Sequence, residues 1–275
     1  MRINFLCVII FLLTGPCYGQ VGEYLGDEKA FYAATKQVNQ FFRRFNGEED
    51  LLGTRYYMQD SNYRDPVLRS KYIKALFDNK QKNISLESKK QFLAEVIDSD
   101  RPQYLELHGG SWFAEVSAKF KYKGRDEKLL LFLRLQEEAV GSKWVIFKAY
   151  FDPFKEYFVV DTASKNKFIH PMSHELDFMN LRKIFDDPEI AVAYTDQNFQ
   201  PDYLSLVLYE IKQTNLKFKT VNQVKFHFFQ LENWYIELSE FNRRGSNTGW
   251  LISNLINVNV QQKDLLRKFI YYEGM

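Results

Sequence analysis

The spacing between apolar residues changes along this chain, and the change decides the class of fold. In the first part, Phe31, Phe41 and Phe45 belong to a series in which apolar side chains recur every three or four residues, as on one face of a helix. From Trp112 to Tyr122 apolar and polar residues alternate, which is the period of a half-buried strand. Helical segments followed by strands predict an α+β protein, with helices packed on an antiparallel sheet.

Capping residues set the bounds of the predicted helices in the first part. The aromatic helix has Asp27 as its N-cap and ends at Asn46-Gly47, a left-handed stop signal. Asp65 and Ser85 are the N-caps of two further helices, and Pro66 suits the first turn after Asp65. These helices are expected at residues 66–77 and 86–97.

Strands are expected in both parts of the chain. In the first part, a turn at residues 123–126 follows the strand that begins at Trp112, and residues 129–135 and 144–151 pair across Gly141-Ser142. In the second part four further segments are predicted to be strands: residues 216–221, 224–229, 234–241 and 250–258. Helices are predicted at 174–185 and 189–194, while residues 201–212 fit either a helix or a strand.

Short matches between the two parts indicate an internal duplication. Residues 102–107 (PQYLEL) resemble residues 201–206 (PDYLSL), and the KFK of residues 119–121 recurs at 217–219. A period of about 100 residues is the size of a compact domain. We therefore expect two tandem modules, residues 20–160 and 168–275, each with N-terminal helices packed on a curved antiparallel sheet. The alternative is that aromatic-rich sheets produce such matches by chance.

Residues 1–19 have the pattern of a cleavable secretory signal peptide. Arg2 precedes the apolar run Phe5–Leu13, and Cys17-Tyr18-Gly19 suits a signal peptidase. The run is about half of the ~20 residues that a membrane-spanning helix needs, so no transmembrane segment is expected in the mature chain. The pattern predicts export to a periplasm or the extracellular space. An alternative is lipoprotein anchoring through Cys17, but Pro16 fits the lipoprotein cleavage box poorly.

Cysteine usage and charge exclude several classes of function. Both cysteines, Cys7 and Cys17, lie in the predicted signal peptide, so we expect neither disulfides nor a cysteine nucleophile in the mature chain. The formal net charge of +2 is spread over interspersed basic and acidic residues, which argues against binding of nucleic acid. The pairs Arg43-Arg44 and Arg243-Arg244 have acidic neighbours and are predicted to form solvated surface ion pairs.

The end of the aromatic helix carries a resemblance to a known family. Phe41-Phe42-Arg43-Arg44-Phe45-Asn46-Gly47-Glu48-Glu49-Asp50 resembles the NTF2-like group of α+β domains, also called SnoaL-like or cystatin-like, over residues 27–152 and more faintly over 170–260. The resemblance implies a cavity between helices and sheet. Enzymes of the group often use an Asp and a His inside that cavity, whereas other members are binding or assembly modules.

The histidines are the main candidates for chemistry. His170 and His174 could share a metal ion with Glu175, but Pro171 and the predicted cap Ser173 spoil the geometry, so no metal site is predicted. Either His108 or His227 could be a general base beside a carboxylate. The alternative for both is a hydrogen-bonded structural histidine on the sheet.

Large rings on the predicted strands are the candidates for binding. An aromatic platform could face outward, or the same rings could fill the cores. The binding candidates are Trp112, Trp144, Trp234, Tyr235, Trp250, His108 and His227. The sequence thus predicts an exported, non-enzymatic binding or assembly protein without a cofactor. It would recognise a partner protein or a hydrophobic ligand through its sheet faces or the groove between modules. The alternative is a cavity enzyme of hydrolase or isomerase type that uses a His/carboxylate pair.

Overall fold

The computed structural model describes residues 37–80, 82–139, 141–158, 195–196, 199, 201–244 and 247–273. Within them lies one six-stranded antiparallel sheet, with the strand order β3-β2-β1-β4-β5-β6. The strands are β1 (Trp112–Tyr122), β2 (Arg125–Glu138), β3 (Gly141–Phe151), β4 (Leu216–Phe228), β5 (Trp234–Phe241) and β6 (Gly249–Asn257). The chain is an α+β protein with an antiparallel sheet, as predicted.

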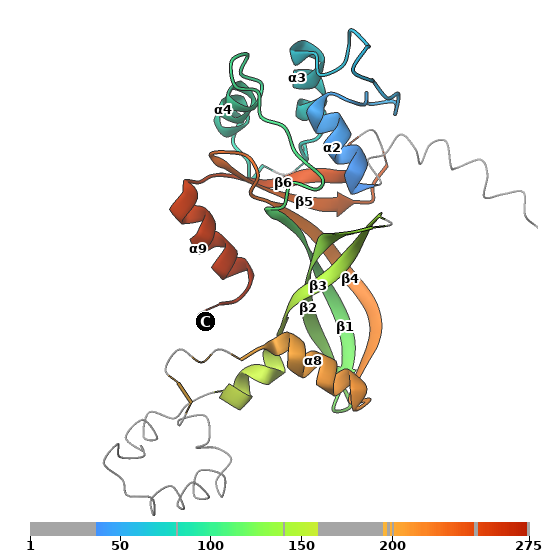
Figure 1. Ribbon diagram of the computed structural model, residues 1–275, viewed down its shortest axis with the longest axis vertical. Coiled ribbons are helices and arrows are strands. Elements are labelled where there is room, and N and C mark those ends of the chain that lie inside the picture. The colour runs from blue at the N-terminus through green and yellow to red at the C-terminus, as the bar shows by residue number, and fades with distance from the viewer. Residues whose placement is uncertain are drawn as a thin grey trace, which may run out of the picture.

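Three helices cover one end of the sheet (Figure 1). They are α2 (Val38–Asn46), α3 (Pro66–Ala75) and α4 (Leu86–Val96). The predicted caps of the last two are confirmed, because Asp65 accepts a hydrogen bond from the backbone N–H of Leu68 at 2.8 Å and Ser85 accepts one from Ser88 at 3.0 Å. Helix α2 ends at Gly47, whose φ of 76° lies in the left-handed region, as its sequence predicts.

Aromatic rings fill the core beneath these helices. Phe41, Phe42 and Phe45 of α2 and Phe92 of α4 pack against the strands, where the Phe92 ring meets the Trp234 ring edge-on at 5.3 Å. A buried aromatic side chain removes a large apolar area from water, so this core supplies much of the stability. The aromatic face that the helical spacing predicts is therefore the face that the protein buries.

A second, smaller core lies at the other end of the long strands. It is covered by α8 (Tyr203–Lys212) and the short 3₁₀ helix η2 (Asp152–Phe158) (Figure 1). Val207 of α8 and Phe154 of η2 pack on β1, β2 and β3. Residues 203–212, which fit a helix or a strand equally well in sequence, are a helix. Asp202 caps it by accepting a hydrogen bond from the backbone N–H of Leu204 at 3.1 Å.

The opposite face of the sheet carries a helix that the sequence did not predict. Helix α9 (Val260–Ile270) packs on a third core, which includes Phe113, Phe132 and Tyr235. It begins with a capping box in which Asn259 and Gln262 exchange hydrogen bonds, both of 2.9 Å. The sheet is thus covered on both faces at its middle.

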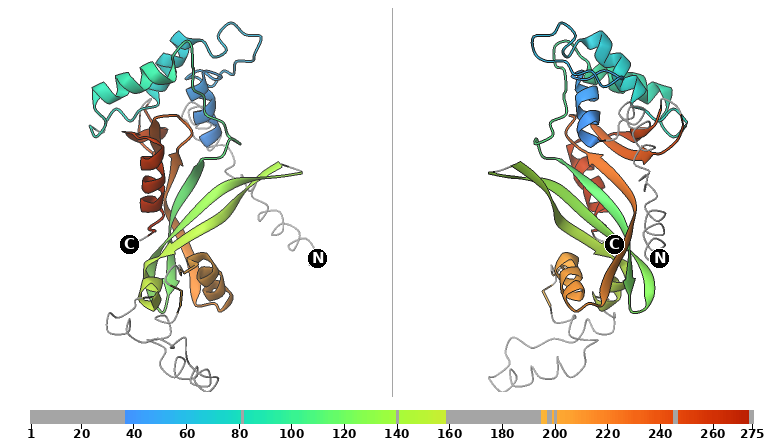
Figure 2. Two further views of the ribbon diagram at one scale, coloured as in Figure 1. Left: turned by 60° about the vertical axis from the view of Figure 1, so that its left-hand side comes forward. Right: turned by 90° about the vertical axis from the view of Figure 1, so that its right-hand side faces the viewer.

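Two hairpins build one half of the sheet. The turn between β1 and β2 is Lys123-Gly124, with φ values of 46° and 83°, which is the left-handed pair that a two-residue hairpin loop requires. The predicted hairpin of β2 and β3 is confirmed, but the predicted turn is wrong: Gly141 and Ser142 belong to β3, where they pair with Glu138 and Glu137. The distal end of this hairpin projects away from the rest of the sheet (Figure 2).

The prediction of two tandem modules is not confirmed, because both halves contribute to a single sheet. All eleven residues of β1 have Cα partners in β4. The matching segments also differ in structure: residues 104–107 form neither helix nor strand, whereas their counterparts 203–206 begin α8. The KFK motif lies near the end of β1 but near the start of β4. Similar hexapeptides can adopt different structures because long-range packing overrides local preference.

The prediction of a solvated Arg43-Arg44 pair is wrong. The side chains of Arg44 and Glu49 are both buried, with Arg43 Nε 2.6 Å and Arg44 Nε 3.4 Å from the Glu49 carboxylate. Close by, the buried guanidinium of Arg69 donates hydrogen bonds to the backbone oxygens of Phe45, Val96 and Gln103. The end of α2 is therefore held by buried charged groups that are paired, as burial requires.

Several predictions fall on residues that the structure does not describe. These are the signal peptide at residues 1–19, Asp27 and Phe31 of the predicted aromatic helix, the helices at 174–185 and 189–194, and the histidines His170 and His174. The described helix α2 begins later than predicted, at Val38, because the backbone of Gln37 is extended. Among the described helices, none is both long and apolar enough to cross a membrane.

Candidate functional site

Three of the predicted tryptophans meet on the face of the sheet that α2 and α4 cover. The Trp112 ring on β1 meets the Trp144 ring of β3 edge-on at 5.5 Å, and the rings of Trp144 and Trp250 both contact Phe226 of β4, at 6.0 and 4.6 Å. The indole N–H of Trp112 donates to the Leu107 backbone oxygen at 2.9 Å. Strands far apart in sequence thus bring these rings into one cluster.

Trp144 is the exposed member of this cluster. Its side chain is 41% exposed, whereas Trp112 and Trp250 are buried. Ile146, two residues further along β3 and therefore on the same face, is 42% exposed. The part of β3 from Gly141 to Ile146 thus presents a tryptophan and an isoleucine to solvent, with buried rings behind the tryptophan.

The apolar surface continues across the sheet between α2 and α8. Val116 of β1 has Leu131 of β2 and Val224 of β4 as its Cα partners, and all three side chains are only partly buried. Direct cross-strand partners project on the same face. Beyond them on β4, Val221 and Phe218 are exposed. An apolar strip therefore runs from Trp144 on one edge of the sheet to Phe218 on β4.

The same strip borders a free strand edge. β3 is the last strand in the order, and no strand within the described part of the chain pairs with its outer side. The exposed N–H and C=O groups of an edge strand can pair with another extended segment. An apolar surface and a row of backbone hydrogen-bonding groups consequently lie side by side at β3.

Trp234 and Tyr235, the other predicted rings, are elsewhere. Trp234 is buried under α4, where its indole N–H donates to Glu95 Oε2 at 2.7 Å. Tyr235 projects from the opposite face into the core beneath α9. Both belong to the packed interior, so the predicted set of binding residues is divided between a surface and two cores.

His227 lies in a buried polar network on the α9 side of the sheet. Its side chain is 2% exposed, and its two ring nitrogens lie 3.1 Å from Glu115 Oε2 and 2.8 Å from the Tyr235 hydroxyl. The register places Glu115 opposite Lys225, which forms an ion pair with Glu237 at 3.1 Å. The network therefore links β1, β4 and β5 by polar side chains.

Electrostatics in this network follow from burial and pairing. Burial raises the pKa of Glu115, but the hydrogen bond and charge of His227, together with Lys225, outweigh it and hold the pKa below its usual value. Burial and the charge of Glu237 raise the pKa of the Tyr235 hydroxyl well above its usual value. Glu115 is thus held as a carboxylate and Tyr235 as a neutral donor.

His108 occupies a different place, at the projecting end of the β2–β3 hairpin. Its Nδ1 lies 3.2 Å from Glu137 Oε1 and 3.4 Å from the Ser142 hydroxyl, and both His108 and Glu137 are well exposed. The two predicted histidines are therefore not brought together. Each has a carboxylate neighbour, one in the interior and one in solvent.

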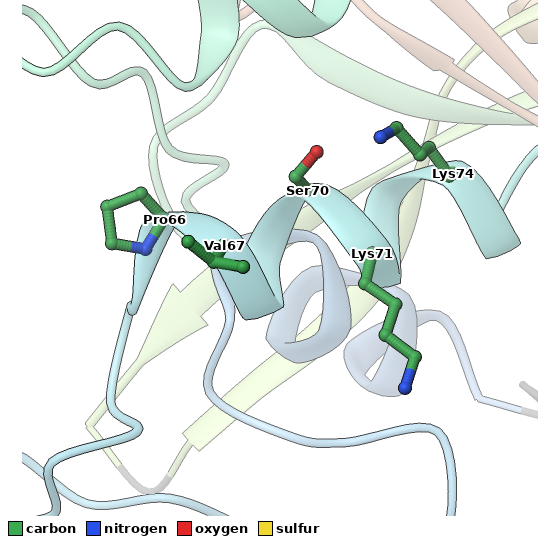
Figure 3. A pocket seen from close by; sticks show the side chains of 5 residues that line it. All are labelled: Pro66, Val67, Ser70, Lys71 and Lys74. Carbon is green, nitrogen blue, oxygen red and sulfur yellow. The ribbon is translucent and has the colours of Figure 1, made fainter.

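A surface pocket lies along one side of α3 (Figure 3). Its volume is about 600 Å³, and its described lining consists of Pro66, Val67, Ser70, Lys71 and Lys74. Neither a histidine nor a carboxylate lines it, so it offers no acid–base pair. Likewise, the described residues include no group of three or more His, Cys, Asp or Glu side chains placed to hold a metal ion.

Sequence reasoning missed Ile146 and Glu115. The alternation on β1 assigns Glu115 to the same face as Phe113, but only the β1–β4 pairing, which joins residues more than 100 positions apart, brings it to His227. Ile146 follows Trp144 at a spacing of two, which does indicate a shared face. What the sequence did not indicate is that β3 would be an edge strand.

Comparisons with known proteins add no relative: no protein-family model, curated protein or solved structure matches this chain.

Proposed function

We propose that this chain is a non-enzymatic binding protein that takes an extended, apolar segment of a partner protein against strand β3. The observation that supports it most is the exposure of Trp144 and Ile146 on one face of an edge strand, at 41% and 42%. Natural proteins protect exposed apolar edges because such edges pair with other chains. An edge that keeps a tryptophan and an isoleucine exposed is suited to a specific partner.

An extended segment fits this place better than a small ligand. Strand addition gains main-chain hydrogen bonds along the edge, while alternate side chains of the added segment contact one face of the sheet. Here that face offers Trp144, Ile146 and then the partly buried Leu133. Small-molecule sites enclose most of their ligand, whereas the Trp144 surface is open.

A binding role also agrees with the arrangement of His227. A general base must reach the proton that it abstracts, within hydrogen-bond distance or through one water molecule. Both ring nitrogens of His227 already have partners, and the side chain is 2% exposed. We therefore assign the Glu115–His227–Tyr235 network to the stability of the sheet.

The relation to the NTF2-like group and the export of the chain are further parts of this proposal. Helices α2–α4 on one face of an antiparallel sheet support the first, as a relation of a single layer rather than of two modules. The pattern of residues 1–19 supports the second. The partner would then be met in a periplasm or outside the cell.

Selection from a displayed random-peptide library tests the proposal. We expect enriched peptides that alternate apolar with other residues, and that shift the tryptophan fluorescence of the protein when they bind. Ile146→Lys should weaken this binding at least tenfold, because it places a charge in the apolar contact. In Trp144→Phe the fluorescence shift should disappear.

Val67→Lys is the matched control, since Val67 is an exposed apolar residue like Ile146 but lies on helix α3 and not on the edge strand. It should leave peptide binding unchanged. Peptides that bind Ile146→Lys as well as the original protein, or a selection that enriches no extended apolar sequence, would refute the role of β3.

A further inference from the structure

Cations gather at the end of the sheet that carries α8. Residues 119–128 (KFKYKGRDEK) and 216–220 (LKFKT) contain seven lysines and arginines but only two acids, Asp126 and Glu127. Residues 119–128 include the end of β1, the β1–β2 turn and the start of β2. Residues 216–220 are the start of β4, which lies at the same end of the sheet (Figure 1). Because the whole chain has a formal net charge of only +2, the remainder is net negative.

The strand register puts like charges opposite one another. Lys119 of β1 is the direct Cα partner of Lys128 on β2, and Lys121 of β1 is the direct partner of Lys217 on β4. All four side chains are exposed. Like charges directly across a ladder are destabilising, so their presence in two pairs needs an explanation other than stability of the fold.

Local acids balance this charge only in part. Asp126 forms an ion pair with Lys219, and the pKa of Asp126 is lowered first by that hydrogen bond and then by the charges of Lys219, Lys119 and Lys121. Three lysines thus converge on one carboxylate. The positive potential of the surface therefore extends into solvent.

Apolar side chains are exposed at the same end of the molecule. Phe218 lies between Lys217 and Lys219 on β4 and is 60% exposed. Helix α8 exposes Leu208, Tyr209 and Ile211. Within the described residues, no strand pairs with the outer side of β4 ahead of residue 225. Along this edge Lys217 projects from one face of the sheet and Phe218 from the other, where it contacts Phe120.

We propose that this end of the sheet, formed by the β1–β2 hairpin, the start of β4 and α8, docks on an anionic phospholipid bilayer. Lysines near such a surface are attracted by its negative potential, and neighbouring apolar side chains enter the interface between headgroups and acyl chains. The proposal is independent of the one for β3, because it uses neither Trp144 nor Ile146.

A bilayer accounts for both kinds of side chain better than a nucleic acid. A nucleic acid would use the lysines and could stack on an aromatic ring, but aliphatic side chains such as Leu208 and Ile211 gain nothing from phosphates or bases. Lysine is also a compact point charge, suited to a fluid array of headgroups that need not be held in one geometry.

Co-sedimentation with lipid vesicles tests the docking. The chain starting at Gln20 keeps every described residue and omits the apolar run Phe5–Leu13, which would bind lipid by itself. We expect it to sediment with vesicles of phosphatidylcholine mixed with phosphatidylglycerol, and not with phosphatidylcholine alone. Added salt should weaken the binding, because salt screens exposed charges.

The double substitution Lys119→Glu and Lys217→Glu should lower partitioning by more than about thirtyfold, because losing two lysines near an anionic surface has that effect and the two glutamates are also repelled. Each new glutamate faces a lysine across the ladder, so the urea midpoint should stay the same or rise. Phe218→Ser should lower partitioning severalfold.

Lys71→Glu with Lys74→Glu is the control, because it changes the net charge equally on the exposed side of α3. It should bind vesicles like the original protein. An equal loss in this control would overturn the proposal, as would equal binding to neutral vesicles. Tight binding of a DNA duplex or an acidic polypeptide without binding of anionic vesicles would overturn it too.

Discussion

The two ends of the sheet use similar residues for different purposes. At the end covered by α2, α3 and α4, aromatic rings such as that of Phe92 are buried. The buried guanidinium of Arg69 at this end donates hydrogen bonds to backbone oxygens. At the end that carries α8, the core is smaller and Phe218 and several lysines face solvent. The sequence has aromatic and basic residues in both places.

This contrast shows that residue type alone does not separate a core from a binding surface. What separates them is the number of layers that cover the strand. Three helices pack over the first end, whereas α8 and η2 cover only part of the second (Figure 1). Stability is therefore concentrated at the first end, whereas the second end leaves more of its side chains exposed.

Replacing one phenylalanine at each end should give the largest difference. The Phe92 ring is fully buried among Phe45, Phe77 and Trp234, so Phe92→Ala should lower the free energy of unfolding by about 4 kcal/mol. Phe218→Ala should lower it by less than about 1 kcal/mol, because the ring is 60% exposed. Urea denaturation measures both, and equal losses would mean that the two ends are equally packed.

The buried arginine gives the next effect. Burial lowers the pKa of Arg69 to about 10, and its guanidinium donates to three backbone oxygens that join α2, α4 and the following segment. Arg69→Met keeps the apolar volume but leaves those oxygens without their donor, and should cost about 3 kcal/mol in urea denaturation.

Arg125→Met, on the exposed β1–β2 hairpin, is the comparison for Arg69 and should change the free energy of unfolding by less than about 0.5 kcal/mol. If the two arginines cost the same, the hydrogen bonds from Arg69 to the backbone would not be what holds the helix-covered end together.

Local sequence signals predicted much of the fold correctly. Asp65 and Ser85 cap helices as expected, Gly47 ends α2 in the left-handed region, and alternation located β1. These features depend on residues close in sequence. Helix α9 carries a comparable signal in Asn259 and Gln262, so it was within reach of the same reasoning.

Long-range pairing explains what sequence reasoning did not find. Neither the single sheet nor the position of β3 at its edge can be derived from local spacing, because both depend on which strands pair. The same holds for the candidate site: Trp144 and Trp112 were found by residue type, but their cluster with Phe226 needs three strands. The lysines looked interspersed because their convergence depends on the β1–β2 and β1–β4 registers.

The smallest predicted effect concerns Glu115, which lies between the two ends. Its pKa in the folded protein is below the usual 4.5, so the folded state binds fewer protons than the unfolded state around that pH. The stabilisation is therefore complete above about pH 4.5 and is lost as the pH falls through the folded pKa. Glu115→Gln should cost about 1 kcal/mol at neutral pH, because it weakens the bond to His227.

In acid, the free energies of unfolding of Glu115→Gln and the original protein should converge, because a protonated Glu115 resembles a neutral amide. Glu156→Gln, at an exposed position of η2, is the control and should leave the free energy of unfolding at neutral pH unchanged. Chemical denaturation over a series of pH values measures this. If the free energies of unfolding of Glu115→Gln and the original protein depend on pH in the same way, the contact with His227 does not stabilise the sheet. The imidazole of His227 would then again be a candidate general base.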